Sequence, residues 1–254
     1  MKHIPDSLWC EIEKLIPEKE TTVGRPEFDR RKTLDGIIYI LYSGSKWSYL
    51  PEKYGCPTTV HGKFMLWSRN GVFQKIMIKA REYYRRRNSK NNWYAFDTIS
   101  RKAPFAKFGG KNPTDRAKRG IKHSVLIDRK GAPMFIDIAP ANHHDAKLLT
   151  AITNQMRKSK QTRILAADSA FDVARLRLMC KEKNIALLAV PNRRRNKNKH
   201  VFQVPHRWKV EQTFGILSWF RGLKICWAKT RESALSFLQM ACSLRLFKMA
   251  GIFG

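Results

Sequence analysis

The stretch ILAADSAFD (residues 164–172) begins with four apolar residues and then reaches Asp168. A short apolar run of this kind is typical of a buried strand in a parallel sheet. The earlier stretch WYAFD (residues 93–97) shows the same arrangement, because its apolar residues lead directly to Asp97. If the two strands are neighbours, both carboxylates lie at one edge of the sheet although they are far apart in the chain.

Strand and helix patterns alternate from residue 93 onward. Two strands flank a turn that contains Gly131, which predicts a hairpin. Asp145 and Asp172 stand at the starts of helical patterns, where they are candidate caps. Strands are predicted over residues 93–100, 123–128, 133–140, 163–168 and 185–191. Helices are predicted over residues 145–158, 172–184 and 206–222, and an apolar helix over 232–250 closes the chain. In chain order these are three strands, then helix, strand, helix, strand and helix. This is the element order of a ribonuclease H-like core, a mixed α/β sheet flanked by helices, although pattern alone does not fix topology.

Residues 1–90 differ in character and are predicted to form a small all-helical domain before the mixed core of residues 91–254. Apolar residues at positions 34, 37, 38 and 41 follow the spacing of an amphipathic helix. Short helices joined by Gly/Pro turns, with basic and aromatic side chains, favour a helix-turn-helix-like DNA-binding domain. The alternative is that Trp47, Trp67 and Phe73 simply build a helical core, and both interpretations can hold together.

The charge balance is strongly basic. Fifty Lys and Arg residues against 20 Asp and Glu residues give a formal net charge of +30. A field of this sign attracts polyanions at long range, and we predict that nucleic acid is the partner. A ribosome-associated protein and an enzyme that is merely basic are the alternatives.

Other features of the sequence bear on localisation. No stretch approaches the roughly 18 apolar residues of a membrane span, and residues 1–15 lack the apolar core of a signal peptide. The five cysteines are scattered without a CxxC pair, which argues against a disulfide framework and a zinc site. His143 and His144 have no second ligand pair at suitable spacing and are interpreted as a loop before a helix. We therefore expect a cytoplasmic, nucleoid-associated protein with no membrane partner.

Carboxylates are scarce after residue 90, since residues 91–254 hold 32 basic and ten acidic residues. Seven of the acids have ordinary positions at helix starts, in a turn or loop, or on exposed faces, namely Asp115, Asp128, Asp137, Asp145, Asp172, Glu182 and Glu232. Asp97, Asp168 and Glu211 remain. Burial of an unpartnered carboxylate is costly, and carboxylates held close together repel unless a cation lies between them. Mg²⁺, or Mn²⁺ in its place, suits such oxygen ligands, so the three acids predict a metal site.

Glu211 lies on a predicted helix in line with Gly215, Ser218 and Gly222, small residues that permit close approach to a sheet or to nucleic acid. Arg207 stands four residues before Glu211 and therefore on the same side of the helix. The alternative is that Arg207 and Glu211 form a surface ion pair without a further role. Together with the two aspartates, the functional interpretation is preferred.

Basic side chains are concentrated on both sides of the predicted site in the sequence. Lys118, Arg119 and Lys122 follow the first acidic strand, and Arg193, Arg194, Arg195 and Lys197 precede the helix of Glu211. A charge run is usually a solvated segment. Beside a metal site we instead predict that these residues and Arg207 contact DNA phosphates, which makes binding steeply salt-dependent.

Several motifs occur together, in one order, over nearly the whole chain. They are GRPEFDRRKTLDGIIYILYSGSKWSYLPEKYG (24–55), TTVHGKFMLWSRNGVFQKI (58–76), FDTISRKAPFAKFGG (96–110), ANHHDAKLL (141–149), AADSAFD (166–172) and RWKVEQTFGILSWFRGL (207–223). With these motifs the chain resembles the transposases of bacterial insertion sequences, of the DDE type with a ribonuclease H-like catalytic core and a helical N-terminal region.

The resemblance implies a role for each of the three acids. Asp97, Asp168 and Glu211 match the family's metal-binding and catalytic residues, and Arg207 matches the arginine of a Tyr-Arg-Glu-Lys signature in which Val204 and Ser218 replace the tyrosine and the lysine. Two divalent ions about 3.5–4 Å apart would serve the reaction.

The implied activity is cleavage of DNA at terminal inverted repeats and transfer of the 3′-OH ends to target DNA. Two DNA ends must be paired, so a homodimer or larger assembly on double-stranded DNA is expected. A ribonuclease H-like nuclease or resolvase without strand transfer, and a catalytically decayed DNA-binding protein, are the alternatives.

Overall fold

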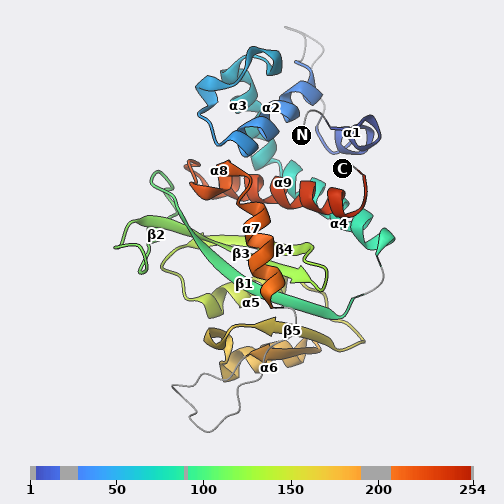
Figure 1. Cartoon of the computed structure of the whole chain (residues 1–254), viewed down its shortest axis with the longest axis vertical. Coiled ribbons are helices and arrows are strands. Elements are labelled where there is room, and N and C mark those ends of the chain that lie inside the picture. Colours follow the sequence, from blue (N-terminus) through green and yellow to red (C-terminus); the bar gives the residue numbers. More distant parts are fainter. Residues whose placement is uncertain (1–3, 18–27, 89–90, 190–206, 253–254) are drawn as a thin grey trace. The chain divides into compact units, whose positions relative to one another are not determined.

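A computed structural model of the chain describes residues 4–17, 28–88, 91–189 and 207–252 (Figure 1). Contacts between residues divide the chain into two units. One unit comprises residues 1–88 together with 218–254, and the other comprises residues 89–217. Arg193, Arg194, Arg195 and Lys197, predicted as DNA contacts, lie outside the described residues.

The first unit is helical. Its helices are α1 (Asp6–Glu13), α2 (Arg30–Ser43), α3 (Pro57–Arg69), α4 (Val72–Arg87), α8 (Arg221–Lys224) and α9 (Arg231–Met249), with 3₁₀ turns at Trp47–Tyr49 and Glu52–Tyr54. Trp67 and Phe73 are buried, whereas Trp47 is half-buried and its ring lies on that of the buried Phe64 with centroids 5.3 Å apart. These aromatic residues do build a helical core, while the predicted DNA-binding role of this unit stays a prediction.

Residues 218–254 differ from the sequence-based division, which placed them with the mixed core. Helix α9 packs on α4 and contacts α2, α3 and α8 within the helical unit. Its side chains at Leu238, Met240 and Phe247 are fully buried. An apolar helix needs an apolar partner to cover it, and here α4 and its neighbours supply that surface.

The second unit is built on a mixed sheet. Its strands are β1 (Trp93–Lys102), β2 (Gly110–Lys111), β3 (Arg119–Asp128), β4 (Pro133–Pro140), β5 (Arg163–Ala167) and β6 (Ile185–Ala189). The sheet runs β2-β3-β1-β5-β6, and β4 also pairs with β3. Strands β1, β3 and β4 are joined antiparallel, whereas β1, β5 and β6 are parallel. The predicted ribonuclease H-like fold is thus confirmed, and the two strands that lead to acids are neighbours.

Within its described residues the second unit also has the α-helices α5 (Asp145–Asn154), α6 (Ala174–Glu182) and α7 (Trp208–Leu217), and a 3₁₀ turn at Ser169–Phe171. Helix α7 crosses the sheet over β1 and β3 (Figure 1). Helix α5 packs on β3 and β4, and α6 packs on β6 and on α5. A side chain of α7 anchors it, because the Thr213 hydroxyl donates to the carbonyl of Gly131, in the β3–β4 turn, at 3.0 Å.

Two predicted caps and one predicted helix are corrected by the structure. His144, not Asp145, caps α5, since its Nδ1 accepts from Ala146 N at 3.2 Å. Helix α6 begins at Ala174 with no side-chain cap, and the carboxylate of Asp172 instead pairs with Arg177 at 2.6 Å. The helix predicted over 206–222 is broken between α7 and α8, where the chain passes from one unit to the other.

Gly222, expected on the same helix as Glu211, lies on α8. A Cβ there would come within 3.0 Å of the Leu41 carbonyl oxygen, so this glycine does permit a close approach, although to α2. In the described parts of the chain, no helix has the length and apolar character needed to cross a membrane.

The hairpin between β3 and β4 gives the first testable prediction. Asp128 is buried, and its Oδ1 accepts from the backbone N–H groups of Lys130 and Ala132, both at 2.9 Å. Asp128→Ala should lower the free energy of unfolding by about 2 kcal/mol, because the buried N–H of Ala132 and the partly buried N–H of Lys130 lose their acceptor. Asp128→Asn keeps an oxygen in place and should cost less. Thermal unfolding of the two variants measures the difference, and equal melting temperatures would contradict it.

Candidate active site

Asp97 lies within β1, not at its end. Strand β1 continues to Lys102, but its pairing with β5 stops at Ala95, which faces Ala166. Asp97 therefore lies level with the end of β5. Asp168 is the residue directly after Ala167, the last residue of β5. The same parallel register, continued by two residues on each strand, sets Asp97 beside Asp168.

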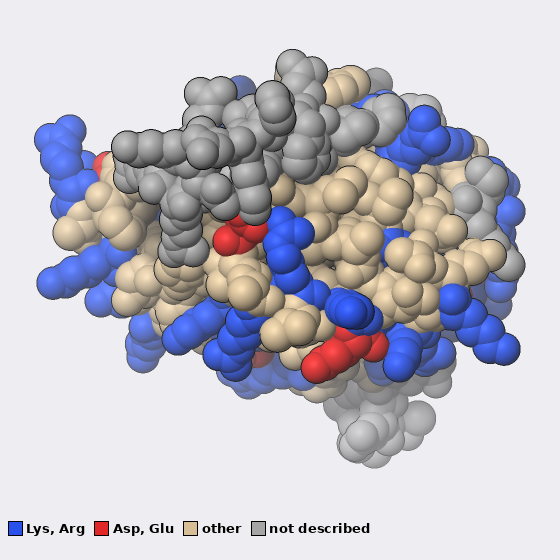
Figure 2. Space-filling view, turned by 90° about the horizontal axis from the view of Figure 1, so that it is seen from below, with Lys and Arg blue, Asp and Glu red and all other residues tan. Residues whose placement is uncertain are grey.

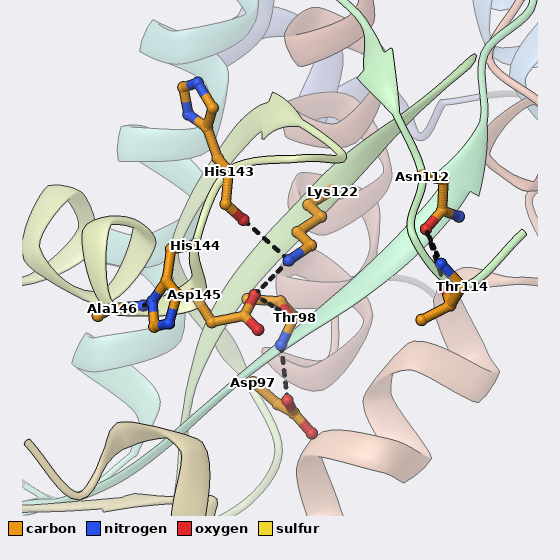
Figure 3. Close-up of polar contacts among 9 residues, drawn as sticks. All are labelled: Asp97, Thr98, Asn112, Thr114, Lys122, His143, His144, Asp145 and Ala146. Carbon is orange, nitrogen blue, oxygen red and sulfur yellow. Dashed lines mark hydrogen bonds and ion pairs between the residues drawn. The ribbon is translucent and has the colours of Figure 1, made fainter. Parts of the chain in front are cut away.

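The Asp97 carboxylate is half-buried. Its Oδ1 accepts a hydrogen bond from the Thr98 N–H at 2.7 Å (Figure 3). Burial raises the pKa of Asp97 above its ordinary value, and the hydrogen bond and the positive charge of Arg207 oppose this effect. The negative charges of Asp168 and Glu211 raise the pKa further. Asp97 therefore responds to both of the other predicted acids.

Glu211 reaches this region from α7. Val210, Phe214 and Leu217 are buried and fix the apolar side of the helix, while the Glu211 side chain is 60% exposed on another side. Because α7 crosses β1 and β3, its first turn brings a third carboxylate to the sheet edge where β5 ends.

Arg207 joins two of the acids. Its Nη1 lies 3.8 Å from Asp168 Oδ1, and its Nη2 lies 3.4 Å from Glu211 Oε1. The ion pair between Arg207 and Glu211, which was the alternative interpretation of the sequence, is thus present, and Arg207 contacts Asp168 as well. Both carboxylates are about half exposed, and ion pairs of this kind contribute roughly 0–1 kcal/mol each. Such contacts are easily exchanged for others.

The donor set fits a divalent cation in its chemistry, since three carboxylates repel one another and offer the oxygen ligands that Mg²⁺ and Mn²⁺ prefer. In the described part of the chain, however, no group of three acidic, histidine or cysteine side chains is placed so that it could hold a metal ion. The positive charge between Asp168 and Glu211 is that of Arg207. Ligation by all three acids would therefore require these side chains to rearrange.

The predicted DNA contacts Lys118, Arg119 and Lys122, around the start of β3, fall into different environments. Lys122 donates to Asp145 Oδ1 at 2.8 Å and to the His143 carbonyl at 2.9 Å, so its ammonium group is already engaged. Arg119 donates to the carbonyl of Ala106 at 2.9 Å. Lys118 is exposed. In Figure 2, basic side chains surround the visible face while acidic ones occur in few places.

Sequence reasoning missed one part of this region. The Thr98 hydroxyl donates to Asp145 Oδ1 at 3.0 Å, so a residue next to Asp97 is tied to the start of α5 (Figure 3). Asp145 was interpreted as a helix cap, and Thr98 carried no signal of its own. The only sequence signal was the unusual presence of an acid in an acid-poor segment.

Comparison with known families decides the relationship. A family model described as "Transposase DDE domain" matches residues 81–246. The chain belongs to the DDE transposase family. A second model, "Putative transposase of IS4/5 family", matches residues 4–77, so the two matches cover both the helical N-terminal region and the mixed core of this chain.

Two relatives from Burkholderia cepacia are similar to this chain. "Putative transposase for insertion sequence element IS402" is 28% identical over 143 residues, which cover 53% of this chain and 66% of the relative. "Insertion element IS402 uncharacterized 16.2 kDa protein" is 33% identical over 79 residues, which cover 29% of this chain and 54% of the relative. The chain thus spans between about half and two thirds of these relatives.

Solved structures show more distant likeness. The catalytic core domain of BIV integrase is 13% identical, with a TM-score of 0.36, and the match covers 60% of this chain and 83% of that one. The piggyBac transposase synaptic complex with hairpin DNA is 9% identical, with a TM-score of 0.47, and the match covers 99% of this chain and 72% of that one. Likeness of this size supports no conclusion by itself.

Arg207 gives a testable prediction for the candidate site. Arg207→Gln should raise the pKa of Asp97, because burial and the negative charges of Asp168 and Glu211 then act without the opposing positive charge. The pKa of Asp97 in the folded state already exceeds its ordinary value, so its contribution to stability falls as pH rises from the unfolded pKa through the folded pKa. The variant should therefore lose more stability at pH 7 than at pH 3, by up to about 1 kcal/mol for each ion pair.

The measurement is the free energy of unfolding of each chain as a function of pH. Lys209→Gln is the matched control, because it removes a positive charge two residues further along, on α7, at a side chain that lies over the Trp208 ring. If both variants follow the same pH dependence, Arg207 does not act on the acids.

Proposed function

We propose that the chain is a metal-dependent DNA transposase that binds transposon terminal inverted repeats, cleaves the DNA and transfers the 3′-OH ends to target DNA. The observation that supports this most directly is the approach of Asp97, Asp168 and Glu211 at one sheet edge in a member of the DDE transposase family. DNA cleavage, strand transfer and the role of each acid are all parts of this proposal.

Asp97, Asp168 and Glu211 would hold divalent cations, Mg²⁺ or Mn²⁺. When bound, two such ions supply an activated water and stabilise the leaving 3′ oxygen. Asp97 is suited to the role because its charged form is disfavoured by burial and by two neighbouring carboxylates. A cation relieves both effects, since it offsets the lost solvation and the repulsion.

Arg207 would change partners during this process. Its pairs with Asp168 and Glu211 are long and partly exposed, so little free energy opposes their exchange. Once released, a guanidinium offers a fork of donors that matches phosphate oxygens. Arg207 would thus neutralise the acids before DNA binds and contact the DNA backbone afterwards.

Double-stranded DNA is the proposed partner, and the formal net charge of +30 favours its approach. The helical unit would contribute to DNA binding, and two copies of the chain would pair two transposon ends. A nuclease or resolvase without strand transfer, and a chain that binds DNA without cutting, are distinguished by the experiment that follows.

The acids give the central prediction. Asp97→Asn, Asp168→Asn and Glu211→Gln should each reduce cleavage by at least about 10³-fold, because losing a metal ligand removes several kcal/mol of transition-state stabilisation. Binding to DNA should persist. Glu182→Gln is the matched control, since Glu182 ends α6 on an exposed surface.

The measurement uses the full chain, Mg²⁺ and a plasmid that carries the DNA flanking its gene, with nicked and joined products separated on gels. Cleavage without joined products would indicate a nuclease or resolvase. Binding without cleavage by the unaltered chain would indicate a DNA-binding protein. Full cleavage by any of the three acid variants would refute the assigned roles.

Lys118 gives a further prediction. The logarithm of DNA affinity should fall linearly with the logarithm of salt concentration, and Lys118→Ala should reduce the steepness by about one unit if Lys118 contacts one phosphate. Lys158→Ala is the control, because Lys158 is exposed in the loop before β5, at the opposite end of that strand from Asp168. Fluorescence anisotropy over a salt series measures both slopes, and identical slopes would exclude a Lys118 contact.

A further inference from the structure

Thr98 connects the two faces of the sheet at the position of Asp97. Successive side chains in a strand point to opposite faces, so Asp97 faces the acids and α7 while Thr98 faces α5. The Thr98 N–H donates to Asp97 Oδ1 at 2.7 Å, and the Thr98 hydroxyl donates to Asp145 Oδ1 at 3.0 Å. Figure 3 shows the continuous path from Asp97 through Thr98 to Asp145.

Asp145 is itself held by a charge. Lys122, from the neighbouring strand β3, donates to the same Asp145 oxygen at 2.8 Å and to the His143 carbonyl at 2.9 Å. The Lys122 side chain is only 14% exposed and that of Asp145 is 31% exposed. A pair shielded to this degree is screened less by solvent than a surface pair, so it can fix the position of the Thr98 hydroxyl.

The cap of α5 does not explain this arrangement. His144 performs the capping, and Asp145, the first residue of the helix, directs its carboxylate toward Thr98 and Lys122. A carboxylate near a helix N-terminus is favourable in any case. That preference does not require a threonine in β1 and a lysine in β3 to share one oxygen atom.

We propose that Asp145, together with Lys122, positions Asp97 through Thr98. The peptide between Asp97 and Thr98 carries the N–H that orients the Asp97 carboxylate, and the hydroxyl bond to Asp145 fixes that peptide from the other face of the sheet. Thr98, Lys122 and Asp145 are positioning residues, because they act through Asp97. The inference rests on the proposed function, in which Asp97 is a metal ligand.

The alternative is a clasp that only attaches α5 to the sheet. Both interpretations expect lower stability when the contact is broken, so stability alone does not separate them. A positioning role also predicts weaker metal binding and slower cleavage with DNA affinity unchanged. Loss of residues that orient a metal ligand typically reduces metal affinity or activity by about 10–100-fold.

The test is Thr98→Val, which removes the hydroxyl and keeps the shape of the side chain and the N–H that contacts Asp97. Mn²⁺ is titrated into the full chain and free Mn²⁺ is followed by electron paramagnetic resonance. Only the binding that Asp97→Asn abolishes is counted. We expect Thr98→Val to weaken this binding and the single-turnover cleavage rate by about 10–100-fold, and Thr98→Ser to restore both.

Thr150→Val is the matched control, because it removes a hydroxyl on α5 that bonds only within its own helix, to the Ala146 carbonyl at 3.1 Å. Asp145→Asn, alone and combined with Thr98→Val, completes the design. If the two residues act through one contact, the double variant should be no worse than the poorer single variant. Asp145→Asn alone carries the test if Thr98→Val does not fold.

Each outcome decides the matter. Lower melting temperatures with unchanged Mn²⁺ affinity and cleavage rate would leave only the clasp and overturn the positioning role. Fully additive effects of Thr98→Val and Asp145→Asn would overturn it as well. An unaltered chain that neither binds Mn²⁺ nor cuts DNA, or an Asp97→Asn chain that does both, would refute the proposed function, and the positioning role would fail with it.

Discussion

The parallel pairing of β1 with β5 is the contact on which the candidate site depends. It joins Trp93 to Ile164 and Ala95 to Ala166, and it thereby sets Asp97 and Asp168 at one level of the sheet. Hydrogen bonds between apolar strands stabilise this register, and the register determines the positions of the two aspartates. The sheet therefore forces together charges that would otherwise separate. The placement of α7 over β1 and β3 adds the charge of Glu211 to the same place.

Arg207 limits the cost of this arrangement. A single guanidinium lies within 4 Å of two carboxylates and lowers the pKa of the third. A tighter, fully buried pair would bind more firmly, but it would also hold the acids away from other cations. The loose pairing with Arg207 offsets part of the repulsion between the carboxylates in the folded chain, and it leaves the carboxylates available to other cations. A site that destabilises its own fold in this way is the usual trade between stability and activity.

Among the described strands, β1, β3, β4, β5 and β6 were predictable from the sequence for local reasons, whereas β2 was not, and the roles of the three acids stay predictions. The apolar runs that lead to Asp97 and Asp168 are each four residues long, and this short length favours buried strands over helices. Contacts between distant residues were not predictable in this way. Lys122 was expected to bind DNA because it belongs to a basic segment, yet β3 places it beside Asp145. The apolar sequence of α9 indicates that another element must cover the helix, but it does not indicate that this element is α4.

The alternation of side chains along a strand has a further consequence for sites of this kind. A carboxylate presented by one face of a sheet is always followed by a side chain on the other face, so its orientation depends on packing that never contacts the substrate. In β1 that neighbour is Thr98, and its hydroxyl donates a hydrogen bond to Asp145. Asp145 is one of the ten acidic residues after residue 90, where there are 32 basic residues. An acid with no more than a capping role could be replaced by asparagine or serine at little cost. The ion pair with Lys122 explains why a carboxylate, and not only a capping group, stands at position 145. Residues on the face covered by α5 thereby contribute to the site on the face covered by α7.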